Sequence, residues 1–183
     1  MKYLITGLPR SRTAWMAEFM PNCVHEPVGY MQKIEDLQQV YSDFDGVSDS
    51  GMGFWLGWIL EHIKPRTVII ERPIEEVEAS LMAMGTKLPA TNFCDLLLEE
   101  LAKFHDHPLV MRVPFSALGN VRVMQKVWWH LLGASHPFDE QRFERMNALK
   151  IETSPIIYVE RTIMQEIMPR IRLKGEPSCQ QHG

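Results

Sequence analysis

The sequence has 183 residues, of which 45% are hydrophobic and 23% are charged, and its formal net charge is −4. These values are typical of a single soluble globular domain with a substantial core. The net charge gives no general reason to expect a nucleic-acid partner. The most apolar run, residues 51–60, is too short to span a bilayer, so we expect no membrane partner either.

Three cysteines (Cys23, Cys94 and Cys179) lie far apart and show no metal-ligand spacing. An odd count of this kind indicates a reducing compartment rather than a disulfide scaffold. The chain begins directly with a strand-like run, so we expect no signal peptide and a cytoplasmic location. The sequence predicts no metal site.

The first fifteen residues predict a strand, a turn and a helix. Residues 3–5 are an apolar run that indicates a buried strand, and the Gly-Leu-Pro at 7–9 interrupts it. The first amides of a helix lack partners within it, and the helix dipole adds partial positive charge there, so such a turn can bind an anion. No acidic residue precedes Glu18. Further donors in the same turn are Arg10, Ser11, Arg12 and Thr13.

Strands and helices then alternate along the chain. Further strands are predicted at residues 22–24, 47–51, 67–70, 108–115 and 156–159. Further helices are predicted at residues 31–41, 55–63, 73–84, 93–105, 121–132, 138–149 and 162–171. We expect residues 175–183 to be a disordered tail.

This alternation predicts an α/β fold in three layers, with a mainly parallel central sheet of about five strands flanked by helices. Residues 1–174 are expected to form one domain. Ligands of such sheets bind beyond the carboxyl ends of the strands. The loops expected at that edge are residues 7–13, 25–30 and 72–73.

The first turn departs from the usual phosphate loop, G-x-x-x-x-G-K-[ST]. Residues 9–15 read P-R-S-R-T-A-W and resemble the P-[KR]-S-G-T-[TS]-W loop of sulfotransferases that use 3′-phosphoadenosine-5′-phosphosulfate. The matching residues are Pro9, Arg10, Ser11, Thr13 and Trp15. Arg12 replaces a glycine and Ala14 replaces a hydroxyl residue. Either the loop is reshaped at Arg12, or Arg12 itself contacts the anion.

A second stretch resembles the same family. An Arg at a strand end and a Ser eight residues later, R-x-P-x-x-x-x-x-S, bind the donor's 3′-phosphate in these enzymes, and Arg72 and Ser80 fit this spacing with Pro73 next to the strand. The planar guanidinium of Arg72 suits a phosphate. A helical Ser leans toward the helix N-terminus, where that phosphate would lie. Without the resemblance, the same residues are an ordinary strand-end Arg and an incidental helical Ser.

Resemblance to small bacterial and phage-type members is weaker beyond residue 108. It includes residues 115–118, 128–132 and 137–142, and residues 172–175 faintly match an R-K-G loop that also contacts the 3′-phosphate.

The resemblance implies a P-loop sulfotransferase-like domain that moves a sulfuryl group from 3′-phosphoadenosine-5′-phosphosulfate to a hydroxyl or amine of a small acceptor. Adenosine 3′,5′-bisphosphate would be the product, and no metal is implied. The cofactor-binding set would be Pro9, Arg10, Ser11, Arg12, Thr13, Ala14, Trp15, Arg72 and Ser80. Arg10 would stabilise the charge of the transferring group. The acceptor's proton requires a base, for which the order of preference is Glu26, His25 and then Asp49.

Two other functions stay open. One is a nucleotide or nucleoside kinase with an altered loop, against which the missing Lys-Ser/Thr pair counts. The other is a binding protein that keeps the nucleotide pocket without catalysis. An acceptor pocket is expected from Tyr30 and residues 51–58 and 86–93; the sequence does not predict an oligomeric state.

Overall fold

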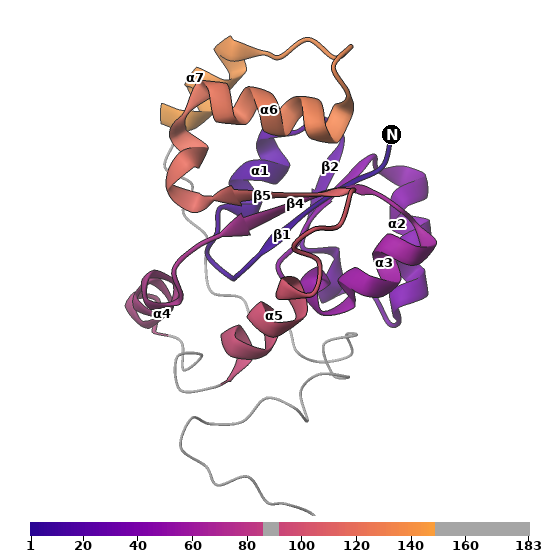
Figure 1. The fold of residues 1–183 in the computed structure, drawn as a ribbon, viewed down its shortest axis with the longest axis vertical. Coiled ribbons are helices and arrows are strands. Elements are labelled where there is room, and N and C mark those ends of the chain that lie inside the picture. The colour runs from indigo at the N-terminus through magenta and orange to yellow at the C-terminus, as the bar shows by residue number, and fades with distance from the viewer. Residues whose placement is uncertain (86–91, 149–183) are drawn as a thin grey trace, which may run out of the picture.

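The computed structural model describes residues 1–85 and 92–148. A single sheet of five parallel strands, in the order β2-β3-β1-β4-β5, forms its centre (Figure 1). The strands are β1 (Tyr3–Gly7), β2 (Cys23–His25), β3 (Gly46–Ser48), β4 (Arg66–Glu71) and β5 (Val110–Pro114). The expected parallel sheet is therefore confirmed.

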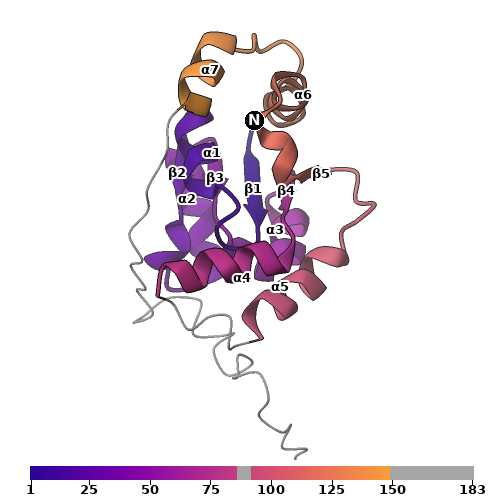
Figure 2. The ribbon, with the colours of Figure 1, turned by 90° about the vertical axis from the view of Figure 1, so that its left-hand side faces the viewer.

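Helices cover both faces of the sheet and complete three layers (Figure 1). One face carries α1 (Thr13–Phe19), α6 (Val121–Leu132) and α7 (Glu140–Ala148); the other carries α2 (Leu37–Asp43), α3 (Leu56–His62) and α5 (Phe93–Ala102). The remaining helix, α4 (Ile74–Ala83), crosses the end of the sheet at which β1 and β4 finish (Figure 2). Short 3-10 helices are η1 (Pro27–Gly29), η2 (Ile34–Asp36), η3 (Gly51–Trp55) and η5 (Phe115–Gly119).

The central strands bury both of their faces, which explains why their sequences are apolar without alternation. Tyr3 and Ile5 pack with α1 and α6, whereas Leu4 between them packs with the helices of the opposite face. In β4, Val68 and Ile69 divide between the two faces in the same way.

The connections define one crevice at the carboxyl edge of the sheet. From β1 the chain leaves through α1 toward β2, whereas from β4 it leaves through α4 and α5 toward β5, on the opposite side. Two adjacent parallel strands whose connections diverge form a topological switch point, and ligands of open α/β sheets bind there. The loops after β1 and β4 therefore flank the expected binding position.

One predicted helix begins later than expected. Residues 31–41 were expected to be helical, but α2 starts at Leu37 after a 3-10 turn. The carboxylate of Asp36 accepts hydrogen bonds from the amides of Gln32 (2.9 Å) and Lys33 (3.2 Å). These bonds satisfy the amides outside a helix, so residues 32 and 33 are not helical. The elements expected at 156–159 and 162–171, the tail at 175–183 and the motif at 172–175 lie outside the described residues.

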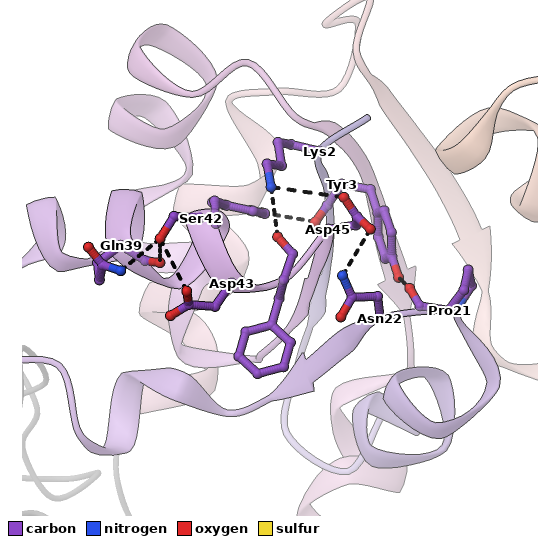
Figure 3. A network of polar contacts seen from close by, with 10 residues as sticks. Lys2, Tyr3, Pro21, Asn22, Gln39, Ser42, Asp43 and Asp45 are labelled. Atoms are coloured by element: carbon purple, nitrogen blue, oxygen red, sulfur yellow. Dashed lines mark hydrogen bonds and ion pairs between the residues drawn. The ribbon is translucent and has the colours of Figure 1, made fainter.

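The amino edge of the sheet holds a network of paired polar groups (Figure 3). Lys2 donates to the carbonyl of Phe44 at 2.8 Å, and its ammonium lies 3.9 Å from the carboxylate of Asp45. Asn22 donates to the same carboxylate at 2.9 Å. The Tyr3 hydroxyl, whose pKa is raised mainly by burial, donates to the carbonyl of Pro21. These contacts join the starts of β1, β2 and β3.

Candidate functional site

The loop after β1 has a backbone that few residue types adopt. Gly7 passes so close to β4 that a Cβ atom at this position would lie 2.5 Å from the carbonyl oxygen of Ile70. Arg10 and Arg12 then adopt left-handed conformations, with φ values of 65° and 62°. Such conformations are costly for residues with a side chain and concentrate at binding and catalytic sites. The loop is therefore strained where it faces the crevice.

Arg12 stands where the family motif has glycine, and its backbone still has positive φ. The loop therefore keeps a conformation that glycine adopts without cost, and a long cationic side chain has been added to it. The side chain of Arg12 is exposed and lies 5.9 Å from the Trp15 ring.

Residues of the second motif contact this loop directly. Arg72 follows β4, and its Nη1 atom donates a hydrogen bond to the carbonyl oxygen of Arg10. From α4, the Ser80 hydroxyl accepts a bond from Nε of Arg10 at 3.2 Å. Two stretches about seventy positions apart, recognised separately in the sequence, thus meet at the switch point.

Charge at this meeting point is mainly positive. Arg72 pairs with Glu76 at 3.3 Å, and Glu76 is half exposed. Within the parts of the chain that the structure describes, Arg12 has no ion pair. Among the described residues, the guanidinium groups of Arg12 and Arg72 have one ion pair between them, that of Arg72 with Glu76, and this excess of positive charge favours an anionic ligand.

Hydroxyl groups add possible donors to the same loop. Ser11 is fully buried, and among the described residues its Oγ atom has no hydrogen-bond partner. A buried polar atom without a partner is costly, so a ligand that bonds to Ser11 would recover this free energy. Thr13 is also buried, and its carbonyl accepts a bond from Ser48 at 2.8 Å, which fixes the start of α1 against β3.

Trp15, predicted to bind the cofactor, packs inside the core instead of forming an open surface. It is 4% exposed, stacks on Phe19 at 5.2 Å between ring centres, and donates from Nε1 to the carbonyl of Met146 at 2.7 Å. The remaining predicted loop residues, Pro9 and Ala14, are half-buried beside it.

The candidate bases lie on the other side of the loop, at the end of β2. Nε2 of His25 is 3.4 Å from the Thr13 hydroxyl and 3.5 Å from the carboxylate of Glu26. Glu26 has a left-handed backbone (φ 48°), and its side chain is 55% exposed. His25 is thus the candidate that contacts the loop, and Glu26 reaches the loop through His25.

Asp49, the third candidate base, is fully buried directly after β3. Its carboxylate accepts hydrogen bonds from the amides of Val28 (3.0 Å), Gly51 (2.7 Å) and Met52 (3.3 Å). Burial raises the pKa of Asp49 to about 7, the charge of Glu26 raises it further, and the three amides oppose the shift. These bonds hold the 3-10 turns after β2 and β3, so Asp49 positions the rim of the site.

A cavity of about 390 Å³ opens beside Arg72 between the carboxyl ends of β4 and β5, within the size range of small-molecule pockets. Phe115 and Arg72 line it together with Leu98 and Leu101 of α5. This cavity does not coincide with the expected acceptor pocket, which was to be formed by Tyr30 and residues 51–58 and 86–93. In that region Met52 is fully buried in the core, and residues 86–91 lie outside the described residues.

Two residues important here were given no role in the site by sequence reasoning. Phe115 contacts Arg12 and Arg72 with ring-centre distances of 5.7 and 4.1 Å. Its position at the end of a predicted strand, residues 108–115, was the available signal, since parallel strands end at one edge. Arg112 pairs with Glu71 at 2.7 Å in the wall of the cavity, and no sequence pattern identified that pair.

No cluster of three or more metal-ligating side chains occurs among residues 1–85 and 92–148. Over the same residues, no helix has the length and apolar character needed to cross a membrane. No protein-family model matches the sequence, and neither a curated protein nor a solved structure matches it. Interpretation of the site therefore depends on its own residues.

Proposed function

We propose that this protein is a sulfotransferase-like enzyme that transfers a sulfuryl group from 3′-phosphoadenosine-5′-phosphosulfate to a hydroxyl or amine of a small acceptor. The observation that carries the proposal is the contact between the two motifs: Arg10 bonds to Ser80 at 3.2 Å, and Arg72 bonds to the Arg10 carbonyl. A ligand with anionic groups at two ends can occupy both motifs only if they adjoin, as they do here.

The residues present fit such a ligand. The guanidinium groups of Arg10, Arg12 and Arg72 suit two anionic groups, and the orphaned Ser11 hydroxyl can donate to one of them. The donor supplies an activated sulfuryl group. Arg10, the cation of the first loop, would stabilise negative charge that grows on the leaving phosphate oxygen as the sulfur–oxygen bond breaks.

His25 and Glu26 are the proposed bases. Removal of the acceptor's proton allows its oxygen or nitrogen to form the new bond to sulfur. Nε2 of His25 is within 3.4 Å of Thr13 in the loop, and Glu26 can stabilise the imidazolium that forms. Replacing His25 with Gln should therefore lower kcat by about 100-fold or more, and Glu26→Gln by less. The opposite order of losses would make Glu26 the base.

Calorimetry separates this proposal from a kinase. We expect adenosine 3′,5′-bisphosphate to bind and ATP with magnesium to bind weakly or not at all. In the kinase motif, Thr13 stands at the position of the Lys, and Ala14 stands where a hydroxyl would bind magnesium. Binding of ATP with magnesium in place of the bisphosphate would contradict the proposal.

A non-catalytic binding protein is the second candidate. It is favoured by the replacement of the motif's hydroxyl by Ala14 and by the involvement of Asp49 in three backbone hydrogen bonds. Turnover with radiolabelled donor and a panel of small alcohols, phenols and amines distinguishes the two. Labelled product that disappears in Arg10→Ala supports the enzyme; tight bisphosphate binding with no product from any acceptor supports the binding protein.

A further inference from the structure

The guanidinium of Arg12 lies near two aromatic rings, one on each side of the crevice: Trp15 at 5.9 Å and Phe115 at 5.7 Å. The backbone of Arg12 belongs to the turn after β1, whereas Phe115 follows β5. The sheet order places β4 between β1 and β5. The side chain of Arg12 therefore connects the loop after β1 with the residue that follows β5, two strands away in the sheet. This places its charge at the side of the crevice where Arg72 lies.

The ring of Phe115 contacts the guanidinium groups of both Arg12 and Arg72. The guanidinium carbon of Arg72 is 4.1 Å from the centre of the same ring. An aromatic face attracts a cation, but two cations on one ring repel each other. The only carboxylate paired with either of them among the described residues is that of Glu76, which bonds to Arg72 and is half exposed. An anion that accepted hydrogen bonds from both guanidinium groups would offset this repulsion.

We propose that Arg12 and Arg72 bind the same phosphate, the one on the ribose 3′ position, and that Phe115 orients both side chains for it. The inference rests on the proposed function, because it takes adenosine 3′,5′-bisphosphate as the ligand. Arg12 is then a specificity residue for the 3′-phosphate, although it lies in the loop that holds the 5′ group. Preference for a 3′-phosphorylated ligand over a 5′-monophosphate depends on this pair of arginines.

The backbone of Arg12 is consistent with this role. A left-handed residue at φ 62° sends its side chain in a direction that a right-handed residue at the same position does not. Strain of this kind persists where surrounding contacts compensate for it. Here the contacts are with Trp15 and Phe115.

The test is calorimetric titration of adenosine 3′,5′-bisphosphate and of adenosine 5′-monophosphate into the wild type and Arg12→Gly. We expect the variant to bind the bisphosphate about tenfold more weakly, the loss of one charge-assisted contact, and to bind the monophosphate within about twofold of the wild type. Glycine fits the positive φ, so the loop backbone is preserved.

Lys64→Gly is the matched control. Lys64 is also an exposed cation with a left-handed backbone (φ 56°), but it precedes β4 at the amino edge of the sheet. This variant removes the same charge and the same backbone strain, and it should change neither affinity. A second variant, Arg12→Gly combined with Arg72→Ala, should bind the bisphosphate little more weakly than Arg72→Ala alone, because the two residues share one phosphate.

The inference is overturned if Arg12→Gly weakens both ligands by the same factor, which would place Arg12 at the 5′ group. No loss with either ligand, or additive losses in the double variant, would also overturn it. If the wild-type protein binds neither ligand, the proposed function fails and this inference fails with it. That outcome differs from a failure of the inference alone, in which the wild type still binds the bisphosphate.

Discussion

The two ends of the parallel sheet differ in how completely their polar groups are paired. At the amino end, Lys2, Asn22 and Asp45 pair with one another and with backbone carbonyls (Figure 3). At the carboxyl end, Arg12 and Arg72 have one ion pair between them among the described residues, that of Arg72 with Glu76. In the same part of the chain the Ser11 hydroxyl is buried without a partner, and two loop residues have strained backbones. Polar groups that have hydrogen-bond partners stabilise a fold. An excess of cationic groups beside a buried hydroxyl without a partner is typical of a site for an anionic ligand.

Arg72→Ala should have the largest effect on binding at the carboxyl end. We expect the affinity for adenosine 3′,5′-bisphosphate to fall by about 100-fold, since a bidentate contact between a guanidinium and a phosphate is lost. Calorimetry with adenosine 5′-monophosphate, which lacks the 3′-phosphate, should show a much smaller loss. Equal losses for the two ligands would mean that Arg72 supports the loop and does not bind the 3′-phosphate.

Glycines at opposite ends of the sheet allow a paired test. A Cβ at Gly7 would lie 2.5 Å from the Ile70 carbonyl oxygen, and one at Gly46 would lie 2.0 Å from the Tyr3 ring. Both Gly7→Ala and Gly46→Ala should lower the free energy of unfolding in urea by about 2–3 kcal/mol. Only Gly7→Ala should also weaken bisphosphate binding. If the Gly46 variant weakened binding as strongly, the two ends would not be functionally separate.

Asp49→Asn tests the buried carboxyl at the rim of the site. The Asn amide group would face the amide of Val28, donor against donor, so unfolding measurements should show a loss of about 1–3 kcal/mol. The folded-state pKa, about 7, exceeds the ordinary value of 3.8, so the folded protein binds this proton more tightly than the unfolded chain does. The resulting stabilisation is complete below pH 3.8 and is lost as the pH rises to 7.

The wild-type advantage over the Asn variant should therefore shrink across that range, by at most about 1.4 kcal/mol per pH unit. Unfolding curves at several pH values between 4 and 8 measure this trend. An advantage that grows with pH would mean that the three amides hold a charged carboxylate.

Tyr41→Phe should have the smallest effect, confined to the amino end. The buried hydroxyl of Tyr41 donates to the carbonyl of Tyr3 at 2.9 Å. Its removal should lower the free energy of unfolding by about 1 kcal/mol and leave bisphosphate binding unchanged. A change in calorimetric affinity would show that the network at the amino end is coupled to the site.

Local sequence patterns were sufficient for the strand-turn-helix units. Apolar runs at β1 and β4 predicted buried parallel strands. The same local patterns predicted Arg72 at the end of β4 and Ser80 in the helix that follows, whereas their proposed roles came from the resemblance. These local patterns did not predict the contacts between those units. The approach of Arg12 to Phe115 depends on a left-handed φ and on the sheet order, neither of which is a local property of the sequence.

The same limit explains Asp49 and the start of α2. An acidic residue after a short strand can be a base, a metal ligand or a backbone acceptor. The amide of Met52 is local to Asp49, but only the folded chain brings the amide of Val28, 21 positions away, to the same carboxylate. At α2, the apolar spacing from residue 31 onward predicted a helix. The bonds that Asp36 accepts from the amides of Gln32 and Lys33 hold these residues outside it.

The most direct test is a crystal structure of the protein with adenosine 3′,5′-bisphosphate. We predict that the 5′-phosphate lies in the loop of residues 9–15, bonded to Ser11, and that the 3′-phosphate lies against the Arg72 guanidinium. A bisphosphate bound elsewhere on the molecule, or one whose 3′-phosphate lies away from Arg72, would contradict the account.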